Sequence, residues 1–297
     1  MKVSVIIVAY RNAGVLKRSL DSFAEFNDLG GDAEVIVVDN SPEGERVLEG
    51  IRDAKYRDFR YIPAENRGFG AGNNMGAKAA SGEILCFMNP DIIYIEPVFG
   101  KAVRLFEENP DLALFGGKLL QEDGSPGFSF FYDYASSLRQ RVGEKIRNRR
   151  DSFDPRTMFT SGADLFVRKD AFFRAGMFDE NIFMYFEEMD LIRRIHRAVP
   201  GARNEYRPEI RMIHLERQST PRGTKAFGIE MESAVYYGKK YGLDYEKKIR
   251  FEWKYLKLKM RIPKFLKREQ IWKLGELKEF MEKEYGEILF RKRQDRK

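Results

Sequence analysis

Three carboxylates stand within four positions of one another, at Glu187, Glu188 and Asp190, directly behind the apolar run 183–186. Acids beside apolar surface acquire raised pKa values, which suits them to remove a proton from an attacking hydroxyl group. The same residues also suit the first turn of a helix, where acids favour the helix dipole and Asp190 can pair with Arg194 four positions later. Taken alone, the cluster leaves both interpretations open.

Two further residues are suited to binding a divalent cation. Asp91 ends an Asn89-Pro90-Asp91 turn behind a buried strand, and Mg²⁺ needs only one or two carboxylates where substrate phosphates supply other ligands. His214 follows the strand-like stretch 210–213 and offers an imidazole ligand for Mn²⁺ or Mg²⁺. The alternatives are a turn without metal for Asp91 and a core hydrogen bond for His214.

A glycine-rich loop with four glycines occupies residues 65–76. Glycines let a backbone approach a ligand closely, and N–H groups at the start of a helix bind anions. Arg67 would add positive charge toward a diphosphate. The spacing matches neither a P-loop, which requires Gly-Lys-Ser/Thr, nor the dinucleotide-binding fingerprint. A flexible turn ahead of a helix is the alternative.

Short buried strands that alternate with helices are expected to position these groups. The apolar, β-branched run 3–10 predicts a strand covered on both faces, and further strands are expected at 34–38, 59–62 and 83–88. This alternation predicts an α/β domain with a mainly parallel sheet, in which ligands bind beyond the carboxyl ends of the strands. The segments at those ends are 10–12, 39–41, 64–72 and 89–91.

The composition is that of a globular protein of 297 residues with 43% apolar content, enough for one large domain or a domain with an appendage. The single cysteine, Cys86, excludes an intrachain disulfide framework and suits a reducing compartment. No segment reaches the roughly 20 apolar residues of a spanning helix, and the N-terminus lacks a signal-peptide pattern. We therefore expect a cytoplasmic protein that could also lie peripherally on the inner face of the cell membrane.

Basic charge is concentrated in a tail at residues 245–297. This tail holds 18 Lys and Arg against nine Asp and Glu, a net charge of +9 that leaves −2 on residues 1–244. Apolar residues recur at helical spacing in two predicted helices: Phe251, Tyr255, Leu258 and Ile262 before Pro263, and Ile271, Leu274, Phe280 and Met281 after it. Basic amphipathic helices bind anionic membrane surfaces, but packing on the domain or on a partner subunit explains the pattern equally well. Nucleic-acid binding is disfavoured because no recognised binding module accompanies the charge.

In chain order, these motifs resemble glycosyltransferase family 2, whose members have the GT-A fold. The resemblance extends over about the first 220 residues and is carried by 3–12, 34–41, 65–74, Asn89-Pro90-Asp91, Ser161-Gly162-Ala163, 183–191 and His214. The glycine-rich loop and the Asn-Pro-Asp turn are most similar to the rhamnosyltransferase branch. The resemblance implies a GT-A domain over 1–244, with a nucleotide-sugar half at about 1–120 and an acceptor half at about 121–244, ahead of the basic helical tail.

The resemblance also implies a role for each candidate residue. Residues that would contact the donor nucleotide and its sugar are Ala9, Tyr10, Arg11, Asp39, Asn66, Arg67, Gly68, Asn73 and Asn89. Asp91 and His214 would hold Mg²⁺ or Mn²⁺, and Glu188 would be the catalytic base. Residues that would support the acceptor side are Gly162, Ala163, Glu187 and Asp190. Two positions depart from the family pattern, since Asn89 replaces the first aspartate of the metal motif and Glu188 stands where many relatives have aspartate.

The implied reaction is inverting transfer of a sugar from a nucleotide-diphosphate donor, dTDP-L-rhamnose by branch resemblance, in cell-surface polysaccharide synthesis. The acceptor would be a saccharide or a polyprenyl-diphosphate-linked saccharide. Two alternatives stay open: a UDP-hexose or UDP-N-acetylhexosamine transferase of the same family, and a non-catalytic sugar-nucleotide-binding or membrane-scaffolding protein. The intact set Asp39, Asp91, Glu188 and His214 disfavours the second. A homo-oligomer is compatible with the sequence, and no nucleic-acid partner is expected.

Overall fold

The computed structural model describes residues 1–42, 44–215, 223–261 and 268–291. The chain divides into two compact units, one formed by Met1–Asp133 with Glu144–Ser219 and the other by Tyr134–Gly143 with Thr220–Lys297. Of the positions expected in the tail, Ile262 and Pro263 lie outside the described residues.

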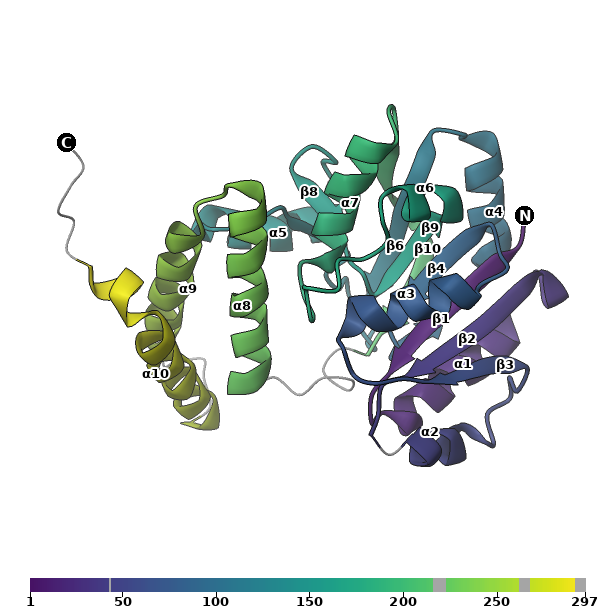
Figure 1. Ribbon diagram of the computed structural model, residues 1–297, viewed down its shortest axis with the longest axis horizontal. Helices are drawn as coiled ribbons and strands as arrows, with labels where there is room; N and C mark the ends of the chain where they lie inside the picture. The colour runs from purple at the N-terminus through teal and green to yellow at the C-terminus, as the bar shows by residue number, and fades with distance from the viewer. Residues whose placement is uncertain (43, 216–222, 262–267, 292–297) are drawn as a thin grey trace. The chain divides into compact units, whose positions relative to one another are not determined.

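The first unit is built on an eight-stranded mixed sheet (Figure 1). Its strands are β1 (Val3–Ala9), β2 (Ala33–Asp39), β3 (Phe59–Pro63), β4 (Ile84–Met88), β5 (Ile92–Tyr94), β6 (Leu112–Leu120), β9 (Asp164–Arg168) and β10 (Arg203–His214). They lie in the order β3-β2-β1-β4-β9-β6-β10-β5. The first four run parallel, β9 is antiparallel to both of its neighbours, and β6 and β10 are again parallel. All four strands predicted from the sequence are present.

Helices cover both faces of this sheet (Figure 1). One face carries α1 (Ala13–Phe26), α2 (Gly44–Ile51) and α4 (Phe99–Glu108), and the other carries α3 (Phe69–Ala79), α6 (Lys169–Arg174) and α7 (Glu187–Ala198). Side chains alternate along a strand, so Val5 and Ile7 of β1 pack in the first layer and Ile6 and Val8 in the second. Burial on both faces explains why the run is apolar at nearly every position.

A small two-stranded antiparallel sheet lies between β6 and β9 in the chain. It pairs β7 (Phe130–Tyr132) with β8 (Met158–Thr160), and α5 (Leu138–Arg149) connects them. Phe130 is fully buried, edge-on to Phe153 and Tyr206. Asn148 secures it, because its Oδ1 accepts the Phe130 N–H at 3.2 Å and its Nδ2 donates to the Phe130 carbonyl at 2.9 Å.

The second unit is helical and contains α8 (Thr224–Tyr241), α9 (Tyr245–Met260) and α10 (Arg268–Phe290). Its buried core consists of Met231, Ile249, Leu256 and Met281. The helix α8 belongs to this unit and packs with both later helices. In the described part of the chain, no helix is long and apolar enough to cross a membrane.

The buried face of α9 is not the face that the spacing of its apolar residues predicted. Leu258 is 41% exposed, and Phe251 and Tyr255 stay outside the buried core. The buried side chains of α9 are Lys248, Ile249, Glu252 and Leu256. Lys248 and Arg141 pair with Glu252 at 2.8 and 2.7 Å, so the charges are compensated inside the unit. Apolar periodicity could not reveal a face that is half polar.

Candidate functional site

The loops predicted to meet at the carboxyl edge of the sheet begin side by side. Ala9 and Asp39 are neighbours in the parallel register of β1 and β2. The Asn40 N–H donates to the Ala9 carbonyl and the Ala64 N–H donates to the Asp39 carbonyl, each at 2.9 Å. The ends of β1, β2 and β3 therefore form one continuous edge, as the strand pattern predicted.

Asp39 is held in a fixed orientation at this edge. It is 1% exposed, its Oδ1 accepts the Ser41 N–H at 2.9 Å, and its Oδ2 accepts the Tyr61 hydroxyl at 2.5 Å. Burial, together with this hydrogen bond and the charge of Asp39, raises the pKa of Tyr61, which therefore remains a donor. The sequence analysis did not identify Tyr61 as a partner of Asp39. Its position on β3, beside the end of β2, could have indicated this contact.

Tyr10 and Arg11 form the exposed part of the edge. Arg11 has a left-handed backbone with φ 53°, and its N–H donates to the Ser41 hydroxyl at 2.8 Å. Its guanidinium lies 5.5 Å from the centre of the Tyr10 ring, which is 41% exposed. An exposed aromatic ring beside a guanidinium offers a flat stacking surface and a positive charge.

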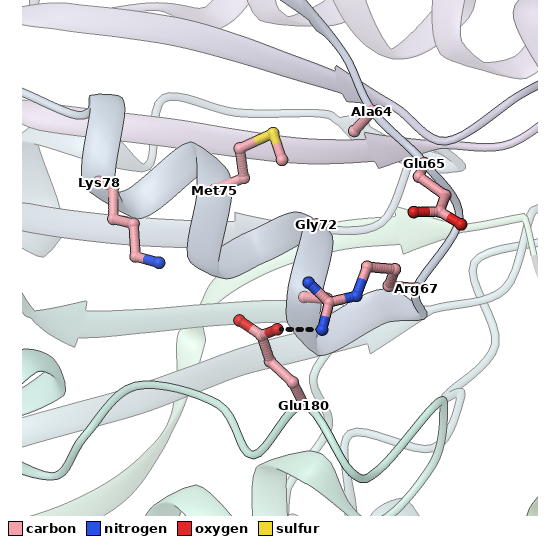
Figure 2. A pocket seen from close by; sticks show the side chains of 8 residues that line it. Ala64, Glu65, Arg67, Gly72, Met75, Lys78 and Glu180 are labelled. Carbon is pink, nitrogen blue, oxygen red and sulfur yellow. Dashed lines mark ion pairs between the residues drawn. The ribbon is translucent and has the colours of Figure 1, made fainter.

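The glycine-rich loop contributes residues with different degrees of access. The Asn66 side chain accepts the Gly68 N–H at 3.3 Å. Arg67 is 64% exposed and pairs with Glu180 at 3.2 Å beside a cavity of about 210 Å³, where Figure 2 shows the two side chains facing each other. Asn73 is fully buried and donates within its own helix to the Phe69 carbonyl. Arg67 is thus accessible to a ligand, whereas the Asn73 amide is not.

Asp91 and His214, more than 120 positions apart in the chain, come together where β5 pairs with β10. The His214 Nε2 lies 3.3 Å from an Asp91 oxygen, and Asp91 is fully buried. One oxygen and one nitrogen ligand fit a divalent cation that takes its other ligands from phosphate and water. No group of three or more potential metal ligands occurs among the described residues.

The acid cluster forms the first turn of α7. The Glu188 Oε1 accepts the Gly162 N–H at 3.0 Å. Glu187 is buried, and its Oε2 finds no hydrogen-bond partner in the described chain. Burial raises the pKa of both acids, with the charge of Glu188 raising that of Glu187 further. Asp190 pairs with Arg194 at 2.6 Å as the helical interpretation predicted, so the acids have separate environments.

The dipeptide Gly162-Ala163 joins the acid cluster to the Asn89-Pro90-Asp91 turn. Gly162 donates its N–H to Glu188, and the Ala163 carbonyl accepts the Asn89 N–H at 2.9 Å. Consecutive Cα atoms are about 3.8 Å apart, so the two halves of the site meet on neighbouring residues. This arrangement follows from the antiparallel pairing of β9 with β4, in which Asp164 lies opposite Met88.

Asp164 is a second residue that sequence reasoning missed. It is fully buried, and its Oδ2 accepts the Gly117 N–H at 2.7 Å. Burial raises its pKa well above the usual range, which favours the protonated acid. An acid directly before the apolar run 165–167 could have indicated this buried position. Its position next to Ala163 supports the dipeptide that joins the two half-sites.

Two solved glycosyltransferases of the GT-A fold share the overall fold of this chain. S. aureus TarS aligns over 91% of this chain and 45% of its own, with a TM-score of 0.53 and 17% identity. The mannosyltransferase PcManGT from Pyrobaculum calidifontis, in complex with GDP-Man and Mn²⁺, aligns over 97% of this chain and 72% of its own, with a TM-score of 0.54 and 15% identity. The predicted GT-A fold is confirmed.

The sequence model of glycosyl transferase family 2 matches residues 4–173, and the chain belongs to this family, as its motifs predicted. The rhamnosyltransferase WbbL of Escherichia coli K12 is 28% identical over 257 residues, covering 79% of this chain and 92% of WbbL. An uncharacterized glycosyltransferase of Bacillus subtilis 168, YfnE, is 27% identical over 264 residues, covering 74% of this chain and 66% of YfnE. The chain therefore spans less than two thirds of TarS and about two thirds of YfnE.

Proposed function

We propose that this chain catalyses inverting transfer of a sugar from a nucleotide-diphosphate donor to an acceptor hydroxyl group. One observation carries the proposal: a partly buried acid, Glu188, is anchored by Gly162 next to the residue that contacts the metal motif, Ala163. An acid of raised pKa beside a site for a diphosphate-bound cation is what direct displacement at an anomeric carbon requires. A protein that only binds nucleotide sugars does not need such an acid.

Glu188 acts as the base in the proposed reaction. The Gly162 N–H fixes one carboxylate oxygen, and the other accepts the acceptor's proton as the hydroxyl oxygen bonds to the anomeric carbon. The bond from that carbon to the diphosphate oxygen breaks on the opposite face, so the configuration inverts. Burial of Glu188 raises its pKa, which favours transfer of the acceptor's proton to it. Positioning of the two reactants accounts for much of the acceleration.

Asp91 and His214 would hold Mg²⁺ or Mn²⁺ in this proposal. Such a cation, when bound, neutralises charge that builds up on the leaving diphosphate. Arg67 is exposed enough to exchange its Glu180 partner for a phosphate oxygen. The Mn²⁺ named with PcManGT supports the use of a divalent ion.

The donor that we propose is dTDP-L-rhamnose, supported by the similarity to the rhamnosyltransferase WbbL. A UDP-sugar is the alternative, since TarS has been solved in complex with UDP. Thymine and uracil both present an imide N–H, which the Asp39 carboxylate would accept, with Tyr10 available for stacking. Discrimination between the two must therefore come from the thymine methyl group, the ribose or the sugar.

The acceptor that we propose is a saccharide, free or linked to polyprenyl diphosphate at the inner face of the cell membrane. The outward face of α9 supports the lipid-linked form, because Lys247, Phe251, Lys254 and Leu258 share one helical stripe. Each Lys near an anionic leaflet contributes about 1 kcal/mol of binding free energy. Apolar residues between lysines suit insertion at the lipid boundary.

Thermal-shift measurements with nucleotide sugars test the reaction class. We expect dTDP-rhamnose with Mg²⁺ or Mn²⁺ to raise the Tm, and Asp91→Asn to remove the dependence on the cation. A large shift with a UDP-sugar alone would replace the donor. No shift with any nucleotide sugar, and no sugar transfer, would reject the proposal.

Vesicle sedimentation tests the membrane surface. Lys254→Glu should reduce binding to phosphatidylserine vesicles by more than tenfold, since reversing one charge near the leaflet changes about 2 kcal/mol. Lys283→Glu on α10 is the matched control, because Lys283 is 83% exposed and lies off this stripe. Equal binding of the two variants to the vesicles would exclude the membrane role. If the protein dimerises and Lys254→Glu abolishes the dimer, the stripe binds a second copy instead.

A further inference from the structure

The turn directly before the acid pair has an unusual backbone. Tyr185 and Phe186 both have left-handed conformations, with φ 69° and 73°. Residues with bulky side chains rarely adopt this region, and such strain persists only where neighbouring contacts enforce it. Phe186 is also the N-cap of α7. The turn decides where Glu187 and Glu188 point, so the contacts that hold its approach segment bear on both acids.

One anchor is a backbone contact with the glycine-rich loop. The Phe69 N–H donates to the Phe183 carbonyl at 2.8 Å. Gly68 has φ +103° and lies so close that a Cβ there would stand 2.8 Å from the Phe183 Cα. Only glycine combines this φ with this approach. The start of α3 is thus locked to the segment that leads into α7.

The second anchor is the side chain of Asn74, which is 1% exposed. Its Oδ1 accepts the Phe178 N–H and its Nδ2 donates to the Phe178 carbonyl, both at 2.9 Å. The same Nδ2 lies 3.2 Å from the Glu180 carboxylate. Asn74 therefore holds one end of residues 178–183, and Phe69 holds the other.

We infer that Asn74 is a positioning residue for the acid pair: it holds segment 178–186 in the strained form that aims Glu188 at the acceptor. This inference rests on the proposed role of Glu188 as the base. Asn74 touches no reacting atom and acts through the backbone of Phe178. Glu180 connects the same segment to Arg67 (Figure 2), so a donor diphosphate that engages Arg67 acts on the anchored segment as well.

Asn148 provides a matched control within the same unit. It is also buried, and it makes the same pair of hydrogen bonds to the N–H and carbonyl of one residue, Phe130. Replacement by alanine removes this pair of hydrogen bonds in both cases, and from Asn148 it also removes those to the Ser129 N–H and the Glu144 carbonyl. Asn148→Ala should therefore lose at least as much stability as Asn74→Ala, whereas only Asn74→Ala removes a contact with segment 178–186.

Hydrogen–deuterium exchange on the full chain tests the anchor without any substrate. We expect Asn74→Ala to speed amide exchange at least tenfold across 178–191, and Asn148→Ala to speed it around Phe130 instead. Should Asn74→Ala fail to fold, Asn74→Asp serves, since it keeps the acceptor for the Phe178 N–H but loses the donor. Unchanged exchange across 178–191 in a folded Asn74 variant would overturn the inference.

Sugar-transfer kinetics provide the second measurement. Displacement of Glu188 by about 1 Å should lower kcat by about 100-fold, with the donor KM changed less than threefold. Asn148→Ala should retain kcat. Equal losses of kcat in the two variants would assign Asn74 a purely structural role. If the unmodified chain transfers no sugar, the proposed function fails, whereas the exchange measurement still decides whether Asn74 anchors the segment.

Discussion

Gly162→Ala is the sharpest test of how the acid cluster is positioned. Gly162 anchors Glu188 through its N–H, and a side chain at this position would occupy the space that the carboxylate now fills. Both Oε1 and Cγ of Glu188 would overlap the alanine methyl group, so the Glu188 side chain must move to accommodate it.

The size of the displacement follows from the geometry. The Glu188 Cγ would lie 2.5 Å from the new Cβ, whereas ordinary contact begins at 3.4 Å, so the side chain must move by about 0.9 Å. A misplacement near 1 Å costs about 100-fold in rate, so kcat should fall about 10- to 100-fold, or about 1.4–2.7 kcal/mol of activation free energy. The unfolding free energy should fall by only about 1 kcal/mol, because the Glu188 side chain can swing aside.

Single-turnover transfer and thermal unfolding separate these two effects. Gly275→Ala is the control, since a Cβ there meets nothing within 4 Å and alanine should stabilise α10 by about 0.5–1 kcal/mol. We expect the control to retain kcat. Full activity of Gly162→Ala would mean that Glu188 need not occupy its observed position, and the assignment of the base would then be wrong.

Three further predictions concern the same edge of the sheet. Glu188→Gln should lower kcat by at least about 100-fold while nucleotide affinity stays within twofold in calorimetry, because the amide cannot accept the proton; retained turnover would exclude Glu188 as the base. Burial, and then the charge of Glu188, raises the pKa of Glu187 above its usual 4.5, so the folded state loses stability as pH rises from 4.5 through the raised value. Glu187→Gln should flatten that loss in Tm measured against pH, and an unchanged profile would contradict it. Tyr61→Phe removes the 2.5 Å hydrogen bond to Asp39. It should lower the unfolding free energy by about 1.5–3 kcal/mol and weaken nucleotide binding. Tyr56→Phe is the control.

Much of the fold was predictable because its signals are local. A strand buried on both faces must be apolar throughout, so residues 3–9 indicated β1 without reference to the rest of the chain. The glycine-rich loop likewise indicated a close backbone approach, and the approach that the structure shows at Gly68 is to Phe183. Chain order then indicated the family, which the family comparison confirmed.

The helical tail illustrates where local signals fail. Its helices were predicted, but the buried face of α9 was not, because Lys248 and Glu252 are buried as a compensated pair. Apolar spacing measures the cost of exposing side chains and contains no information about which charges will find partners. Binding of the outward face of α9 to a membrane, rather than to a partner subunit, remains a prediction.

The sequence by itself determined the residue types that can do chemistry and the strands that end beside them. Tertiary structure alone decided which of them meet: β9 enters antiparallel beside β4, and this brings Gly162 to Glu188 and Ala163 to Asn89. It also brought His214 to Asp91 and Asn74 to Phe178. These contacts join segments far apart in the chain, and their partners are fixed by strand order and register, which periodicity along a single segment does not encode.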